Sequence, residues 1–169
     1  MSFNPARAAA GPFPAAAGAG IDARMFAKLL KGLMAPVPAE LTAPEAELAL
    51  AALLVRLARA DGHYADPEMR RIDLVLGTRY GLTPFEAARV RSEAEVLESE
   101  APDTVRFTRA LKEAVPHEDR MSLIEALWTV ALSDGGRDAD EDALIRLVAS
   151  LLGIGDKDSA LARQRVERR

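Results

Sequence analysis

One acidic segment occurs twice in the chain, and this duplication constrains the fold more than any other feature. Residues 134–141 read DGGRDADE, and residues 61–68, 73 positions earlier, read DGHYADPE. Each copy has Asp-Gly, five further residues and Glu. At the same offset Leu50, Leu54, Ala58, Ile72, Leu74 and Val75 match Leu123, Leu127, Ala131, Ile145, Leu147 and Val148. A repeat of this length predicts two copies of a helix–loop–helix unit.

The first and last acids of each copy lie in register with apolar helical stripes. Steps of 4, 7 and 11 back from the aspartates reach Leu57, Leu54 and Leu50 in one copy and Val130, Leu127 and Leu123 in the other. Steps of 4 and 7 forward from the glutamates reach Ile72 and Val75, and Ile145 and Val148. A helical face repeats at this spacing. We therefore expect Asp61, Glu68, Asp134 and Glu141 to lie at helix ends and to face the interior.

Inward carboxylates are costly unless they are paired, hydrogen-bonded or bound to a cation. Capping and turn formation account for Asp66, Asp138 and Glu141. They leave Asp61 and Asp134 unexplained, because an aspartate after a helix C-terminus is repelled by the helix dipole. Three alternatives stay open: a bound divalent cation, an internal salt-bridge network with Arg59 and Arg137, or neither.

Carboxylate ligands favour a hard cation, so Ca²⁺, Mg²⁺ or Mn²⁺ is the expected metal if one binds. His63 would shift the preference toward zinc, but the second copy has Gly136 at that position. The loops are not EF-hands, since the sixth and twelfth positions counted from Asp134 are Ala139 and Ile145 instead of Gly and Glu.

Composition narrows the class of protein. The net charge of −4 gives no general attraction to nucleic acid or to an anionic membrane. The absence of cysteine excludes disulfides, thiolate catalysis and cysteine-based zinc sites, and fits a cytoplasmic protein. No apolar run approaches the roughly 18 residues of a membrane-spanning helix, so stable membrane insertion is not expected.

The spacing of apolar residues and the residues that typically start and end helices predict an all-α fold. We expect a single helical bundle of about seven or eight helices. Residues 1–20, rich in Ala, Gly and Pro, are predicted to form a disordered tail, and residues 21–169 the helical domain. Residues 21–34 form an amphipathic helix that either packs on the domain or binds a membrane surface or partner. Further helices are expected over residues 43–60, 66–80, 84–99, 103–115, 117–133, 138–152 and 156–167, with a capping box formed by Asp138 and Glu141.

Enzyme signatures are absent. The chain has only two histidines and no Glu-x-x-His, His-Glu-x-x-His, Gly-x-Ser-x-Gly or glycine-rich phosphate loop. Trp128 is expected in the core, and the acidic run of Glu93, Glu95, Glu98 and Glu100 on a solvated helix face. A non-enzymatic module is therefore the expectation, with a metal-dependent hydrolase as a remote alternative.

The segments ARADGHYADPEMRRIDLVL and EALWTVALSDGGRDADEDALIRLVASLLGI resemble the paired acidic motifs of tellurite-resistance TerB-like proteins. The same helical fold supplies the N-terminal domain of a membrane-anchored DnaJ-type co-chaperone, and the resemblance covers about residues 21–166. It implies a helical bundle with a divalent-cation site, carried onto Asp61, Glu68, Asp134 and Glu141, and a link to tellurite or stress resistance. We expect a cation-binding module that works with a protein partner; the alternative is a metal-free protein–protein interaction scaffold.

Overall fold

The computed structural model describes residues 22–36, 40–101 and 103–169, and their regular structure is entirely helical. The all-α prediction is therefore confirmed. The predicted tail at residues 1–20 lies outside the described residues. The elements in chain order are α1 (Ala23–Met34), α2 (Ala43–Ala58), α3 (Asp66–Tyr80), α4 (Pro84–Glu100), α5 (Thr104–Ala114), the 3₁₀ turn η2 (His117–Asp119), α6 (Arg120–Ala131), α7 (Ala139–Leu152) and α8 (Asp156–Glu167).

Local signals set many of the helix ends. Thr42 and Glu45 form a reciprocal capping box at the start of α2, in which Glu45 Oε2 accepts a hydrogen bond of 2.7 Å from the Thr42 amide. Thr83 and Glu86 repeat this arrangement at the start of α4. Gly81 ends α3 in the left-handed conformation, with φ of 69°, which glycine adopts without steric cost.

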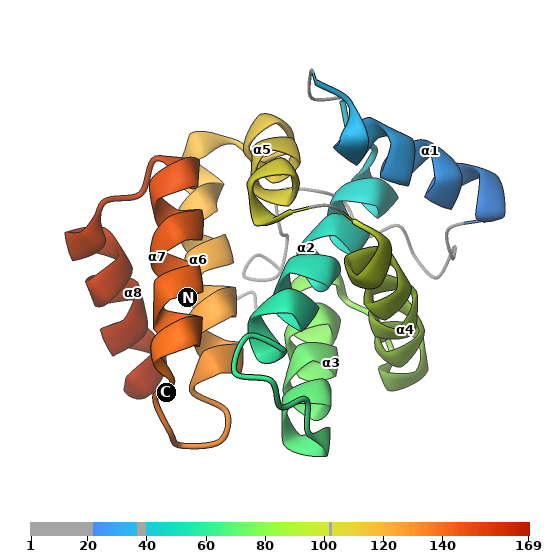
Figure 1. Ribbon diagram of the computed structural model, residues 1–169. Helices are drawn as coiled ribbons and strands as arrows, with labels where there is room; N and C mark the ends of the chain where they lie inside the picture. Colours follow the sequence, from blue (N-terminus) through green and yellow to red (C-terminus); the bar gives the residue numbers. More distant parts are fainter. Residues whose placement is uncertain (1–21, 37–39, 102) are drawn as a thin grey trace, which may run out of the picture.

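Helix α2 is the centre of the bundle. From Glu45 to Ala58 every side chain is buried except that of Arg56. A helix that is apolar on nearly all sides requires neighbours on all sides. Helices α3, α4, α5, α6 and α7 all contact α2 and provide that enclosure (Figure 1).

The two halves of the sequence duplication pack against each other as equivalent units. One unit is α2 with α3 and the other is α6 with α7, and α6 contacts both α2 and α3. Equivalent positions share the same environment: Leu50 and Leu123 are buried, whereas Leu74 and Leu147 are 58% and 44% exposed. The loops of both units lie at the same end of the bundle, the lower edge of Figure 1.

Helices α1 and α8 cover opposite ends of this arrangement (Figure 1). Helix α1 packs on α4 and α5 and buries Leu29 and Leu33, so its apolar face is occupied by the domain itself. Arg106 of α5 holds the end of α1 through a hydrogen bond of 2.8 Å to the Met34 carbonyl. Helix α8 packs on α6 and α7. Within the described ranges no helix has the length and apolar character needed to cross a membrane.

Candidate functional site

The two Asp-Gly loops have the same local geometry. Asp61 Oδ1 accepts a hydrogen bond of 2.7 Å from the His63 amide, and Asp134 Oδ1 accepts one of 2.9 Å from the Gly136 amide. The glycine that follows each aspartate is left-handed, with φ of 79° at Gly62 and 77° at Gly135. Each aspartate therefore uses one oxygen to close its own turn, as Asp side chains commonly do.

Gly135→Ala is expected to lower the free energy of unfolding by about 1–2 kcal/mol, because a residue with a Cβ is strained at this φ. Urea denaturation of the variant beside Gly136→Ala checks this. Gly136 has no positive φ, and a Cβ there would lie 3.4 Å from Asp134 Oδ1, an ordinary contact. Equal losses in both variants would contradict a conformational origin.

The glutamates that end the two segments are buried, with exposed fractions of 6% for Glu68 and 5% for Glu141. Their contacts differ. Glu68 Oε2 accepts a hydrogen bond of 2.8 Å from the Ala65 amide and so caps α3. At α7 the cap is Asp138, whose Oδ1 accepts from the Asp140 and Glu141 amides. No bond returns from the Glu141 side chain to this cap among the described contacts, so the predicted reciprocal capping box is only half formed.

The prediction that all four acids face inward is wrong for Asp134, which is exposed, while Asp61 is half-buried. Helix α2 ends at Ala58 and helix α6 at Ala131, each three residues before the aspartate. Helical periodicity therefore stops before it reaches Asp61 or Asp134. Asp66 also differs from the prediction, because it is the first residue of α3 and Ala65 occupies the cap position.

The fold brings the carboxylates of both loops into one electrostatic cluster. Burial is the largest cause that raises the pKa of Glu141, from the usual 4.5 to about 7. Negative charges also raise it, and they belong to Asp61, Glu68, Asp134 and Asp138. Two loops that are 73 residues apart in sequence thus act on the same carboxyl group.

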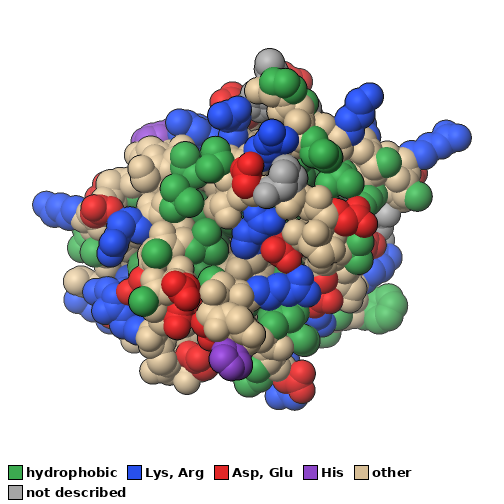
Figure 2. All heavy atoms as spheres, viewed as in Figure 1, with side chains coloured by type: hydrophobic (Ala, Val, Ile, Leu, Met, Phe, Trp, Pro, Cys, Tyr) green, Lys and Arg blue, Asp and Glu red, His purple; other side chains and the backbone are tan. Residues whose placement is uncertain are grey.

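Glu68 belongs to the same cluster. Its pKa is raised mainly by burial, and the charges of Asp61 and Asp134 add to the effect. The hydrogen bond from the Ala65 amide and the neighbouring His63 act in the opposite direction. Figure 2 shows acidic side chains beside a histidine near the lower edge of the molecule, the end at which both loops lie in Figure 1.

The arginines nearest in sequence have other partners. Arg59 Nη1 lies 2.6 Å from Glu98 Oε2, and its guanidinium lies over the Tyr64 ring. Arg137 pairs with Asp142. The salt-bridge alternative for Asp61 and Asp134 is therefore not realised through these two arginines. The cation nearest to Asp61 among the described ion pairs is His63, whose Nδ1 is 3.9 Å from Asp61 Oδ2 and which is charged only when protonated.

The donor chemistry of the cluster fits a hard divalent cation, since it consists of carboxylate oxygens with no thiolate. The geometry is not a closed cage. Among the described residues no three carboxylate or histidine side chains are close enough together to hold an ion without rearrangement. Asp134 is exposed and Asp61 is half-buried, whereas both glutamates are buried.

The acidic run of α4 has a structural role that the sequence did not indicate. Glu98 binds Arg56 and Arg59 of the α2 end, at 3.2 Å and 2.6 Å. Glu95 accepts a hydrogen bond of 2.8 Å from the Tyr64 hydroxyl. The prediction of a solvated face is therefore wrong for Glu95 and Glu98, which are half-buried and tie the first acidic loop to α4. For Glu98 the sequence signal is its position one turn after the buried Ala94.

Fold and site together define a class of protein: an all-helical module in which two helix–loop–helix units present acidic Asp-Gly loops at one end. Comparison with protein-family models gives the family. The model described as tellurite resistance protein TerB matches residues 47–164, and the chain belongs to this family. No curated protein and no solved structure matched the chain significantly.

Proposed function

We propose that this TerB-family module is non-enzymatic and binds a divalent cation through Asp61, Glu68, Asp134 and Glu141. Ca²⁺, Mg²⁺ and Mn²⁺ are the preferred ions, because every donor is a carboxylate. The observation that carries the proposal is the joint action of both acidic loops on the buried carboxyl of Glu141. A cation would relieve this repulsion, and the flanking Arg59 and Arg137 are engaged elsewhere.

The proposed role within the cell follows the family. Its description ties the family to tellurite resistance, so we place this module in that response or in a broader stress response. The absence of cysteine fits work in the cytoplasm. Loops at one end that carry the cation would leave the remaining surface for a protein partner.

Thermal unfolding of chelator-treated protein with and without Ca²⁺, Mg²⁺, Mn²⁺ and Zn²⁺ tests the cation site. An ion at 100 times its Kd is expected to stabilise the native state by about 2.7 kcal/mol, which raises the Tm by several degrees. Asp134→Asn is expected to remove this response. Asparagine keeps an oxygen that accepts the Gly136 amide hydrogen bond, so the variant loses charge and preserves the turn.

Asp158→Asn is the matched control, because Asp158 is an exposed aspartate in the first turn of α8. It should keep the full cation response. Absence of a shift with every ion would contradict the proposed site and leave the metal-free interaction scaffold as the alternative. A shift that survives in Asp134→Asn would place the ion elsewhere.

A further inference from the structure

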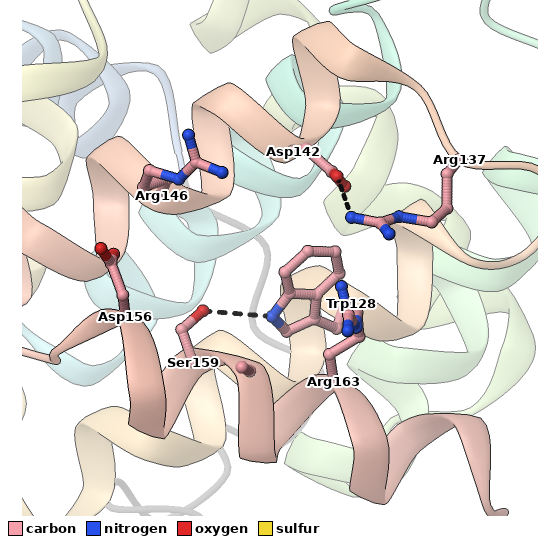
Figure 3. Close-up of a pocket in the computed structure, with 8 residues that line it drawn as sticks. Trp128, Arg137, Asp142, Arg146, Asp156, Ser159 and Arg163 are labelled. Carbon is pink, nitrogen blue, oxygen red and sulfur yellow. Dashed lines mark hydrogen bonds and ion pairs between the residues drawn. The ribbon is translucent and has the colours of Figure 1, made fainter.

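A second charged site lies where α6, α7 and α8 meet. A pocket of about 260 Å³ opens there (Figure 3). Three of its lining residues are arginines from different parts of the chain: Arg137 before α7, Arg146 on α7 and Arg163 on α8. Trp128 of α6 and Ser159 of α8 also line it.

The three arginines differ in how strongly they already pair with other side chains of the protein. Arg137 is paired with Asp142, which also lines the pocket. The Arg163 guanidinium lies 5.7 Å from the Trp128 ring centroid, and its buried Nε has no hydrogen bond. The nearest carboxylate to that Nε is Glu167, at 3.5 Å. Arg146 is exposed and makes no ion pair within the described part of the chain.

The pocket also contains a neutral hydrogen-bond donor, the hydroxyl of Ser159, which Trp128 holds in position. The Trp128 indole Nε1 donates to Ser159 Oγ over 3.3 Å. The Ser159 oxygen is thus an acceptor for the indole, and its own hydrogen donates to no described acceptor. Both side chains are nearly buried, with exposed fractions of 6%, so this hydroxyl is held in place at the pocket wall (Figure 3).

The charge balance favours an anion. Three guanidinium groups face two carboxylates, those of Asp142 and Asp156, so the lining carries a net positive charge. Arg163 is only weakly held, because its buried Nε makes no hydrogen bond and its ion pair with Glu167, which does not line the pocket, is 3.5 Å long. Guanidinium groups match the oxygens of phosphate and carboxylate. The three guanidinium groups come from different segments of the chain and can approach a ligand from different directions. A tetrahedral group offers oxygens in more directions than a planar carboxylate, which has two oxygens in one plane.

We propose that this pocket binds a phosphate group, either as the free ion or on a small phosphate ester. Arg146 would turn inward to complete the contact, Arg137 and Arg163 would flank the anion, and the Ser159 hydroxyl would donate to it. The site uses none of the four carboxylates assigned to the ion, and it shares with them only the second acidic segment, to which Arg137 belongs.

Trp128 provides the measurement, because it is the only tryptophan of the chain and it lines the pocket. Its fluorescence is followed during titration with inorganic phosphate, phenyl phosphate and benzoate at constant ionic strength. Phosphate is expected to give a saturable change. Tighter binding of phenyl phosphate would identify an ester as the ligand type, whereas equal or weaker binding would identify the free ion. Arg146→Gln is expected to raise the Kd about tenfold, the loss typical of one charge-assisted contact.

Arg24→Gln on the distant α1 is the matched control, because Arg24 is likewise exposed. It should bind phosphate as the wild type does. Either of two results would overturn the proposal: no saturable change with either phosphate compound, or the same affinity in Arg146→Gln as in the wild type. A stronger response to benzoate than to phenyl phosphate would also overturn it, since a planar carboxylate would then be preferred.

Discussion

Glu141→Gln is expected to stabilise the cation-free protein by on the order of 3 kcal/mol at about pH 8.5 and to change little near pH 4. The folded-state pKa of Glu141 is about 7, against the usual 4.5. Between these values the unfolded chain loses the proton while the native state keeps it, so the wild type loses stability as the pH rises. Glutamine has no proton to lose and escapes this penalty.

Urea denaturation of chelator-treated protein across this pH range measures the difference between variant and wild type. The same variant should lose the stabilisation by a cation, because an amide is a weaker ligand than a carboxylate. One substitution would thus stabilise the ion-free protein and abolish its response to the ion. A variant less stable than the wild type at high pH would mean that the Glu141 carboxylate has a compensating partner. A full cation response in the variant would remove Glu141 from the site.

Glu47→Gln is expected to have a similar effect on stability without any effect on cation binding. Glu47 of α2 is 6% exposed, and burial raises its pKa to about 7. The charges of Glu86 and Glu93 raise it further, and Arg89 opposes them. Since the folded-state pKa is raised, the wild type again loses stability between pH 4.5 and about 7. The gain in the variant above this range is on the order of 3 kcal/mol.

The comparison of the two glutamine variants separates burial from ligand binding. Both remove a buried carboxylate whose pKa is about 7. The charges that act on the pKa of Glu47 belong to Glu86, Glu93 and Arg89 and not to the four carboxylates of the proposed site, so Glu47→Gln should keep the cation-induced shift in Tm that Glu141→Gln loses. Loss of the shift in both variants would indicate that the cation-induced shift depends on the stability of the whole protein and not on Glu141 as a ligand. A pH-independent difference for Glu47→Gln would contradict the raised pKa.

On the raised pKa values of Glu68 and Glu141, the cluster of the four carboxylates would destabilise the ion-free protein at neutral pH, because the buried glutamates must either retain protons or repel the neighbouring aspartates. A protein of this size has a small net stability, so a penalty of a few kcal/mol is a considerable fraction of the total. Cation binding would remove that penalty, and the fold would become more stable when the ion is present.

Much of the helical framework was predictable from the sequence, because the signals that end helices act within a few residues. The predicted helices over residues 66–80 and 156–167 have the same bounds as α3 and α8. The duplication was also visible, since matched positions such as Leu50 and Leu123 carry the same side chain and the same burial. The family assignment agrees with the resemblance seen in the two acidic segments.

The members of the candidate site stay a prediction, and the inward geometry expected for them is wrong for Asp134. The four carboxylates were selected by their register, and the structure joins them electrostatically. Their inward direction required the helices to continue to the aspartates, and both helices end three residues earlier. Asp134 is exposed for that reason, and only the glutamates, which lie inside the first turns of α3 and α7, are buried.

The sequence by itself determined the helices, their duplication and the acids at the loop ends. The tertiary structure alone decided which charges meet. Arg59 pairs with Glu98, 39 residues away, and makes no ion pair with Asp61 among the described contacts. The arginines of the pocket at α8 come together in the same way. Helix signals depend on backbone groups one turn apart, whereas a long charged side chain takes whichever partner the packed helices place within its reach.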